Sequence, residues 1–285
     1  MKPAAFSYFA PSTLEEALEI LQSSDLESRV LAGGQSLVPM MNFRLARPEA
    51  LVDINRIAGL SEVGVIDGHL EIGALARHAR FERPVTDGPL GILLPKIARQ
   101  IAHLPIRLRG TFAGSIAHAD PAAEWCTLAV ALDAEIIARS VSGTRVIPTA
   151  AFFKSIFTTD LKPEEMIVAV RLPHLGMDWR CGFEEFSRRA GDFAIVSALA
   201  CLRLENGRIS EARAALGGVV SRPVRSLAAE SVLGGEKPSP DIFREAARRA
   251  AAELEPLGDI HGSPEYKSDL VSVMLRRALE QALTP

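Results

Sequence analysis

The stretch 29-RVLAGGQSLVPMM-41 places two adjacent glycines, a glutamine and a serine between a short apolar run and a segment with helical spacing. The pattern predicts a strand, a tight turn and then a helix over 36–46. Glycine lacks a Cβ and adopts positive φ without strain, so its backbone can approach another group closely. Successive N–H groups in such a turn can surround an anion. We therefore expect a ligand, and first of all a phosphate, to lie against Gly33 and Gly34.

A second stretch, 109-RGTFAGSIAHADP-121, has the same character. It supplies small residues and hydroxyl groups, and it precedes a helix that we expect to begin at Pro121 with Asp120 as its N-cap. Two such loops favour a diphosphate over a single phosphate, because each hydrogen bond to a charged group contributes about 1.5–3 kcal/mol. Small-residue turns before helices are common, however, so either loop alone is weak evidence. Neither loop has the spacing of a Rossmann fingerprint or a P-loop.

The composition limits the class of protein. A chain of 285 residues predicts two domains, or three small ones. With 32 Lys and Arg against 35 Asp and Glu, it lacks the basic excess of a nucleic-acid-binding protein. The apolar runs are too short to span a bilayer, and the N-terminus lacks a signal peptide, so we expect a cytoplasmic protein. Its three cysteines match no zinc or iron–sulfur spacing, and we expect no metal site on this chain.

The remaining patterns indicate an α+β fold. A capped amphipathic helix is expected over 12–22, followed further on by several strands, and the pattern breaks around 173–182, where we place a domain boundary near residue 177. Beyond it, Asn206-Gly207 is typical of a two-residue hairpin turn. Three helical patterns close the chain. We therefore expect a small antiparallel sheet packed with helices in the C-terminal third.

The combination of 31-LAGGQSLVPMMNFRLARPEALVDINRI-57, 110-GTFAGSIAHADPAAE-124, 161-LKPEEMIVAVRLP-173 and 187-SRRAGDFAIVSA-198 closely resembles the medium, flavin-carrying subunit of molybdenum hydroxylases. That family includes subunits of carbon monoxide dehydrogenase and xanthine dehydrogenase. The resemblance implies a two-subdomain FAD-binding domain of the vanillyl-alcohol-oxidase (PCMH) type over 1–177, with subdomains of about 1–57 and 58–177. It implies a C-terminal α+β domain like that of the carbon monoxide dehydrogenase flavoprotein over 178–285.

The resemblance also implies residues that bind a noncovalent FAD. Two loops would wrap its pyrophosphate and ribityl chain: Ala32, Gly33, Gly34, Gln35, Ser36, Leu37, Val38 and Pro39 in the first, and Thr111, Phe112, Ala113, Gly114 and Ser115 in the second. Ile101 and Leu161 would lie beside the flavin, Glu124 would accept hydrogen bonds from FAD hydroxyls, and Phe193 would lie against the isoalloxazine. Each of these four residues also has an ordinary structural explanation, as a core side chain or as a carboxylate in the first turn of a helix.

One position departs from the family pattern. Relatives usually have a glycine where this chain has Ala113, so we expect an ordinary, negative φ there, with the N–H contact retained. His118 and Asp120 resemble catalytic residues, but we expect a local structural role for both: Asp120 as the cap of a helix, and His118 in shaping the loop.

The absence of a nucleophile–base constellation predicts that this chain carries no catalytic residue, so its role would be to position and tune the flavin. By the resemblance, FAD would pass electrons from [2Fe-2S] clusters on a small subunit to an external acceptor. A large subunit would carry molybdopterin, in a heterotrimer or a dimer of heterotrimers. Two alternatives stay open: a self-sufficient FAD-dependent oxidase acting directly on an organic substrate, and a flavin-free assembly module.

Overall fold

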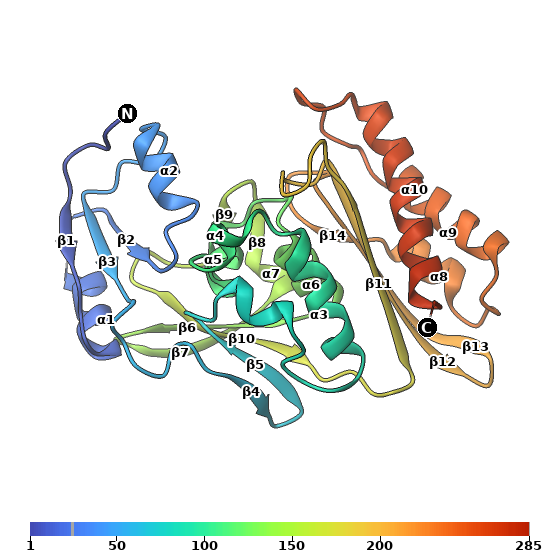
Figure 1. Ribbon diagram of the computed structural model, residues 1–285, viewed down its shortest axis with the longest axis horizontal. Helices are drawn as coiled ribbons and strands as arrows, with labels where there is room; N and C mark the ends of the chain where they lie inside the picture. Colours follow the sequence, from blue (N-terminus) through green and yellow to red (C-terminus); the bar gives the residue numbers. More distant parts are fainter. Residues whose placement is uncertain (24–25, 285) are drawn as a thin grey trace.

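The computed structural model describes residues 1–23 and 26–284, in which three larger sheets follow one another along the chain and a two-stranded sheet accompanies the second (Figure 1). A small N-terminal sheet lies at one end, a five-stranded sheet with several helices lies in the middle, and a four-stranded sheet covered by helices lies at the other end. Helices and mainly antiparallel sheets are both present, which confirms the predicted α+β class.

The N-terminal sheet is parallel, with strand order β1-β3-β2. The strands are β1 (Ser7–Phe9), β2 (Ser28–Leu31) and β3 (Ala50–Asp53). The last residues of β2 and β3 are paired, so the loops that follow these two strands start at the same edge. Helix α1 (Leu14–Ser23) has the predicted capping box, because Thr13 Oγ1 accepts from Glu16 N at 3.2 Å while Glu16 Oε2 accepts from Thr13 N at 3.3 Å.

The middle sheet is antiparallel throughout, with strand order β4-β5-β10-β6-β7. Its strands are β4 (Val63–Ile66), β5 (His69–Gly73), β6 (Glu135–Ser140), β7 (Gly143–Pro148) and β10 (Met166–Pro173). A two-stranded ribbon stands beside it, formed by β8 (Phe153–Ser155) and β9 (Thr158–Thr159). The helical segments of this part are η1 (His78–Glu82), α3 (Gly88–Gln100), α4 (Leu104–Arg107), α5 (Phe112–His118), α6 (Glu124–Ala131) and α7 (Thr149–Phe152).

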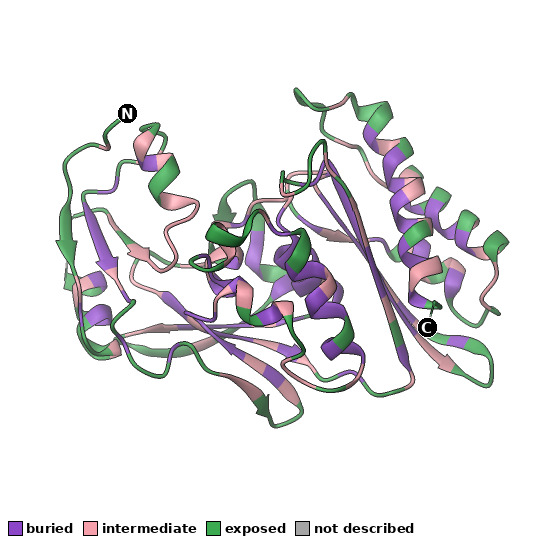
Figure 2. Ribbon diagram, viewed as in Figure 1, coloured by how far each residue is buried: buried purple, intermediate pink, exposed green. Residues whose placement is uncertain are grey.

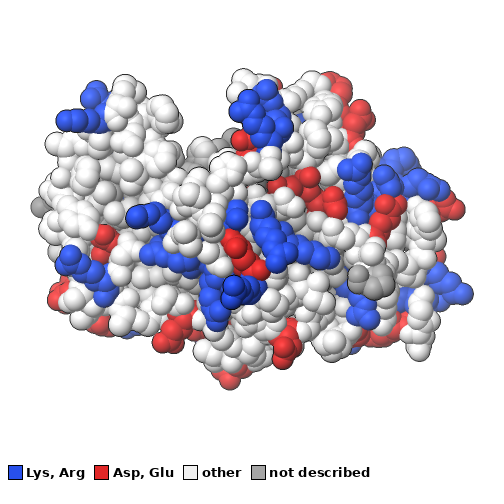
Figure 3. Space-filling view, in the orientation of Figure 1, with Lys and Arg blue, Asp and Glu red and all other residues white. Residues whose placement is uncertain are grey.

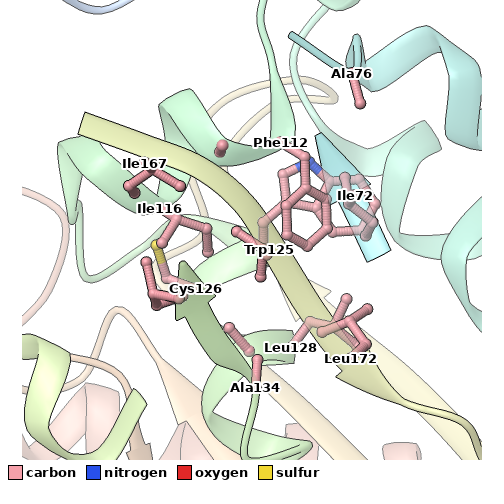
Figure 4. Packing of buried hydrophobic residues seen from close by; sticks show 14 of the residues in the cluster. Ile72, Ala76, Phe112, Ile116, Trp125, Cys126, Leu128, Ala134, Ile167 and Leu172 are labelled. Atoms are coloured by element: carbon pink, nitrogen blue, oxygen red, sulfur yellow. The ribbon is translucent and has the colours of Figure 1, made fainter. Parts of the chain in front are cut away.

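An aromatic cluster fills the centre of the middle part (Figure 4). The ring of Phe112 lies 4.7 Å from that of Trp125 and 5.5 Å from that of Phe81, and all three side chains are fully buried. Trp125 Nε1 donates to His78 Nδ1 at 2.9 Å, which satisfies the one polar atom of the indole. The second glycine stretch is therefore anchored in the core through Phe112.

The C-terminal sheet has the order β11-β12-β13-β14 and is covered on one face by helices (Figure 1). Its elements are β11 (Trp179–Phe186), β12 (Val196–Glu205), β13 (Arg208–Gly217), β14 (Val224–Arg225), α8 (Leu227–Leu233), α9 (Pro240–Glu253) and α10 (Pro264–Ala282). The β12–β13 turn is the predicted hairpin, since Asn206 and Gly207 have φ values of 51° and 72°.

Strand β12 is buried on both faces (Figure 2). Val196, Ala198, Ala200 and Leu202 belong to the core under α8, α9 and α10. Leu199 and Cys201 alternate with them and belong to the large core of the preceding part of the chain, where the sheet packs against α3 and α6. The second sheet face is therefore an interface rather than a solvent surface.

Two predicted helices differ from those observed. Helix α2 spans only Leu37–Asn42 rather than 36–46, because Arg44 has a positive φ of 60° and the chain leaves the helix there. Leu45, which lies at helical spacing in the sequence, falls outside the helix and is 76% exposed. The helix expected from Pro121 begins at Glu124 instead, since Asp120 caps a turn by accepting from Ala122 N at 2.9 Å.

The domain boundary predicted near residue 177 falls between β10 and β11 and stays a prediction. The last residue of the predicted C-terminal domain, Pro285, lies outside the described residues. Among the described residues, none of the helices combines the length and the apolar character that crossing a membrane requires.

Candidate functional site

The first glycine loop presents a run of unpaired backbone donors. It joins β2 to α2, and Gly34 has a positive φ of 70°. Within the described part of the chain, no acceptor is paired with the N–H groups of residues 33–37, whereas Val38 N and Met40 N already donate to Gly34 O and Ser36 O, each at 3.1 Å. Gln35 Nε2 donates to Gly33 O at 2.9 Å, which holds the turn from within. Consecutive free N–H groups of this kind form an anion-binding concavity.

The absence of a side chain at Gly33 has a different cause from the predicted one. An ideal Cβ there would lie 2.3 Å from the carbonyl oxygen of Arg109 and 2.6 Å from Cα of Gly110. The second loop, not a ligand, therefore occupies the space that a Cβ would need. Gly110 is itself constrained, because its Cβ would lie 2.6 Å from His78 Nε2. The two loops are thus stacked on the aromatic core through two glycines.

The second loop turns its side chains inward. Thr111 is the N-cap of α5 and accepts from Gly114 N at 3.0 Å, while Phe112 and Ala113 are buried. Ala113 lies in the first helical turn and is absent from the residues with positive φ, which confirms the expected ordinary backbone. At Gly114 a Cβ would lie 2.6 Å from Thr111 Oγ1, so this glycine serves the cap. Only the backbone here and the half-buried Ser115 can reach a ligand.

A cleft of about 620 Å³ lies in front of the first loop. Six predicted residues line it: Ala32, Gly33, Gly34, Gln35, Val38 and Pro39. Asp53, Asn55, Pro105 and Arg109 also line it, and the sequence analysis did not select them. Asn55 follows β3, whose parallel pairing with β2 brings it beside the first loop, and no motif marks it in the sequence. Figure 3 shows Lys and Arg side chains gathered in the middle of the molecular face, over the region of α4 and α5.

Phe193 lies in another cleft, of about 640 Å³. The ring is 59% exposed and stands between residues 120–122 and 156–157 on one side and the C-terminal domain on the other. Its loop also lies against the residues that follow Ile101, because a Cβ on Gly191 would lie 2.7 Å from Cε1 of His103 and 3.0 Å from the carbonyl oxygen of Ala102. Ile101 is 8% exposed and Leu161 is partly buried against the same core. The structure thus brings the first-loop residues together but places Phe193 in a separate hollow.

Glu124 is an ionisable group in an apolar setting. It is 4% exposed, and burial, followed by the nearby Glu185, raises the pKa of its carboxyl to about 8. Burial also raises the pKa of Glu185 to about 7. At neutral pH Glu124 is therefore mainly protonated, and a protonated carboxyl can donate as well as accept a hydrogen bond. This differs from the acceptor-only carboxylate expected from the sequence.

His118 makes a structural contact, and its expected role in shaping the loop stays a prediction. Its ring stacks on that of Phe157 at 4.7 Å, and burial lowers its pKa. Asp120, as described above, accepts within a turn instead of capping the helix.

Known proteins resemble this chain over nearly its whole length. Residues 4–175 match the family described as the FAD binding domain in molybdopterin dehydrogenase, and residues 182–282 match the CO dehydrogenase flavoprotein C-terminal domain. The chain is 40% identical to the alpha subunit of the 6-hydroxypseudooxynicotine dehydrogenase complex of Paenarthrobacter nicotinovorans, over 99% of this chain and 96% of that relative. It is 36% identical to the nicotine 6-hydroxylase medium subunit of the same organism, over 99% of each chain.

The fold agrees with a solved structure as well. Carbon monoxide dehydrogenase from Hydrogenophaga pseudoflava, in a form that lacks the Mo-pyranopterin moiety of its cofactor, matches with a TM-score of 0.94 and 34% identity. The match covers 99% of this chain and 98% of that one.

Proposed function

The chain belongs to the family of FAD-binding subunits of molybdopterin dehydrogenases, and we propose that its two glycine loops hold the FAD diphosphate in an electron-transfer subunit. It is an oxidoreductase subunit, with FAD on this chain and molybdenum and iron–sulfur cofactors on other subunits of such complexes. The separate matches of residues 4–175 and 182–282 support a division into an FAD-binding domain over 1–177 and a C-terminal domain over 178–285.

The observation that carries the proposal is the run of free N–H groups over residues 33–37, of which Gly33, Gly34 and Gln35 line a cleft of about 620 Å³. Two phosphate groups need several donors at once, and backbone donors at a turn are already oriented before the ligand arrives. The residues present therefore fit the diphosphate. The noncovalent attachment that we propose rests on these hydrogen bonds.

The burial and exposure of the other predicted residues indicate which part of FAD each could contact. Glu124, largely protonated, is suited to exchange hydrogen bonds with hydroxyl groups of the ribityl chain. Ile101, Leu161 and the exposed Phe193 offer apolar surface for the flavin ring, and the partly open position of Phe193 supports a contact made by ligand rather than by core. In the second loop, the backbone would contribute and the buried side chains of Thr111, Phe112 and Ala113 would hold its shape.

We propose that FAD, when bound, accepts electrons from the [2Fe-2S] clusters of a small subunit and delivers them to an external acceptor. The partners would be that small subunit and a large molybdopterin-binding subunit, in a heterotrimer or a dimer of heterotrimers; the membership of the relatives in multi-subunit complexes supports a partnered chain. We keep the cytoplasm as the expected compartment, which the three free cysteines support.

The test is the flavin content of the purified full-length chain. We expect a yellow protein that releases about one FAD per chain on denaturation, measured by fluorescence of the supernatant. A colourless chain that also fails to bind added FAD would refute the proposal. The alternative of a self-sufficient oxidase predicts substrate turnover by this chain alone, whereas an electron-transfer subunit predicts turnover only by the co-purified complex.

A further inference from the structure

A hydrogen-bonded relay runs from the N-terminal sheet to both glycine loops. Tyr8 Oη donates to Asp53 Oδ2 at 2.5 Å, and the other oxygen of Asp53 accepts from Asn55 Nδ2 at 2.6 Å. Asn55 Nδ2 also donates to Ala32 O at 2.7 Å, at the start of the first loop. Arg77 Nη2 donates to Asn55 Oδ1 at 2.6 Å. These hydrogen bonds connect Tyr8, Asp53, Asn55 and Arg77 to one another and to the backbone of Ala32.

Arg77 connects this relay to the second loop. Its Nη1 donates to the carbonyl oxygen of Arg109, the same oxygen that lies closest to the missing Cβ of Gly33. One guanidinium therefore links the residue that precedes Gly110 with Asn55, which in turn holds the residue that precedes Gly33. The planar fork of an arginine can serve both acceptors at once, and a lysine ammonium lacks that fixed geometry.

Charge near the cleft is not balanced by ion pairs. Arg109 lines the cleft, and across residues 1–23 and 26–284 neither Arg109 nor Arg77 forms a salt bridge. Burial, followed by the neighbouring Arg109, lowers the pKa of Arg77, so the two guanidinium groups repel each other. Asp53 supplies one negative charge but is occupied by Tyr8 and Asn55. An anion at the mouth of the cleft would relieve the repulsion.

We propose that Arg77 is a positioning residue that sets the distance between the two loops, and that Arg109 contacts the FAD diphosphate as a cation. The inference rests on the proposed function. It explains why the first loop, whose own side chains are uncharged, can hold a doubly charged group: the positive charge is supplied by Arg109, which also lines the cleft. It also gives the two arginines different roles, a geometric one for Arg77 and an electrostatic one for Arg109. The salt dependence of FAD binding distinguishes these two roles.

The experiment measures the dissociation constant of FAD by fluorescence titration of the full-length apo chain at low and high salt. Arg109→Gln should raise this constant about tenfold or more at low salt and flatten its salt dependence, because one charge-assisted contact is lost. Arg77→Lys keeps the charge but loses the fork, so it should raise the constant by a similar factor while leaving the salt dependence intact. Arg80→Gln is the matched control, an exposed arginine on the same segment, and should behave like the wild type.

Asn55→Ala provides an independent test of the positioning role. It breaks the other half of the link, and combined with Arg77→Lys it should add little to the single change, since both act through one connection. FAD binding by the wild type together with unchanged constants in Arg77→Lys and Arg109→Gln would overturn this inference alone. Failure of the wild type to bind FAD would overturn the proposed function and the inference with it.

Discussion

Replacing Gly33 by alanine tests the geometry that joins the two loops. The new Cβ would lie 2.3 Å from the carbonyl oxygen of Arg109, whereas ordinary contact begins at 3.4 Å, so the loops must separate by about 1.1 Å, the difference of the two. A hydrogen bond lengthened by that much is lost. If the diphosphate then reaches donors of only one loop, two charge-assisted bonds of about 1.5–3 kcal/mol each disappear, which is about a 10²- to 10⁴-fold weaker affinity.

The assay is FAD titration of the apo chain together with thermal unfolding. We expect Gly33→Ala to unfold at a lower temperature, by an amount that reflects about 1–3 kcal/mol of overpacking, and to lose most of its FAD affinity. Gly64→Ala is the control, because Gly64 lies in β4 with ordinary φ and nothing within 4 Å of its added Cβ. A Gly33→Ala protein that binds FAD within about threefold of the wild type would refute the reasoning.

Three further changes probe the supports of the site. His78, whose pKa falls to about 4 through burial, is less protonated folded than unfolded, so stability should decline as pH falls from 6.5 toward 4; His78→Gln, which keeps an acceptor for Trp125, should reduce that decline in unfolding experiments to the part that the lowered pKa of His118 contributes. Glu124, with a pKa raised to about 8, is more protonated folded than unfolded, so stability should decline as pH rises from 4.5 through 8; Glu124→Gln should leave only the smaller decline from Glu185, whose pKa is about 7, and an undiminished decline would count against this. Thr111→Ala removes the cap on Gly114 N and should cost about 1 kcal/mol, seen as a melting temperature lower by a few degrees; an unchanged melting temperature would show that the cap is dispensable.

Local signals in the sequence predicted local structure well. The Thr13–Glu16 capping box and the Asn206-Gly207 hairpin are formed as expected, because each depends on residues within three positions of one another. The first loop was also predicted as a turn between a strand and a helix. Its Gly34 has the positive φ that the glycine pair indicated.

The contacts between the two glycine loops could not be predicted from the sequence, because they join residues that are far apart along the chain. A side chain at position 33 is excluded because Arg109 and Gly110, which are distant in the sequence, lie against the backbone of Gly33. Arg77 and Asn55 carry no motif of their own and become important only because parallel pairing and η1 bring them together. The sequence analysis predicted a loop where helix α5 lies. The helix has only seven residues, and its apolar residues are too few to form a clear periodic pattern.

Strand β12 limits how this chain can be recombined with its relatives. Because its alternate residues belong to two different cores, a crossover placed between the two family segments would join a new sheet face to an unfamiliar surface of α3 and α6. A hybrid that exchanges the C-terminal part should therefore also carry the matching residues of these two helices. Two family models match separate parts of the chain, but the shared packing of β12 means that both parts have to be engineered together.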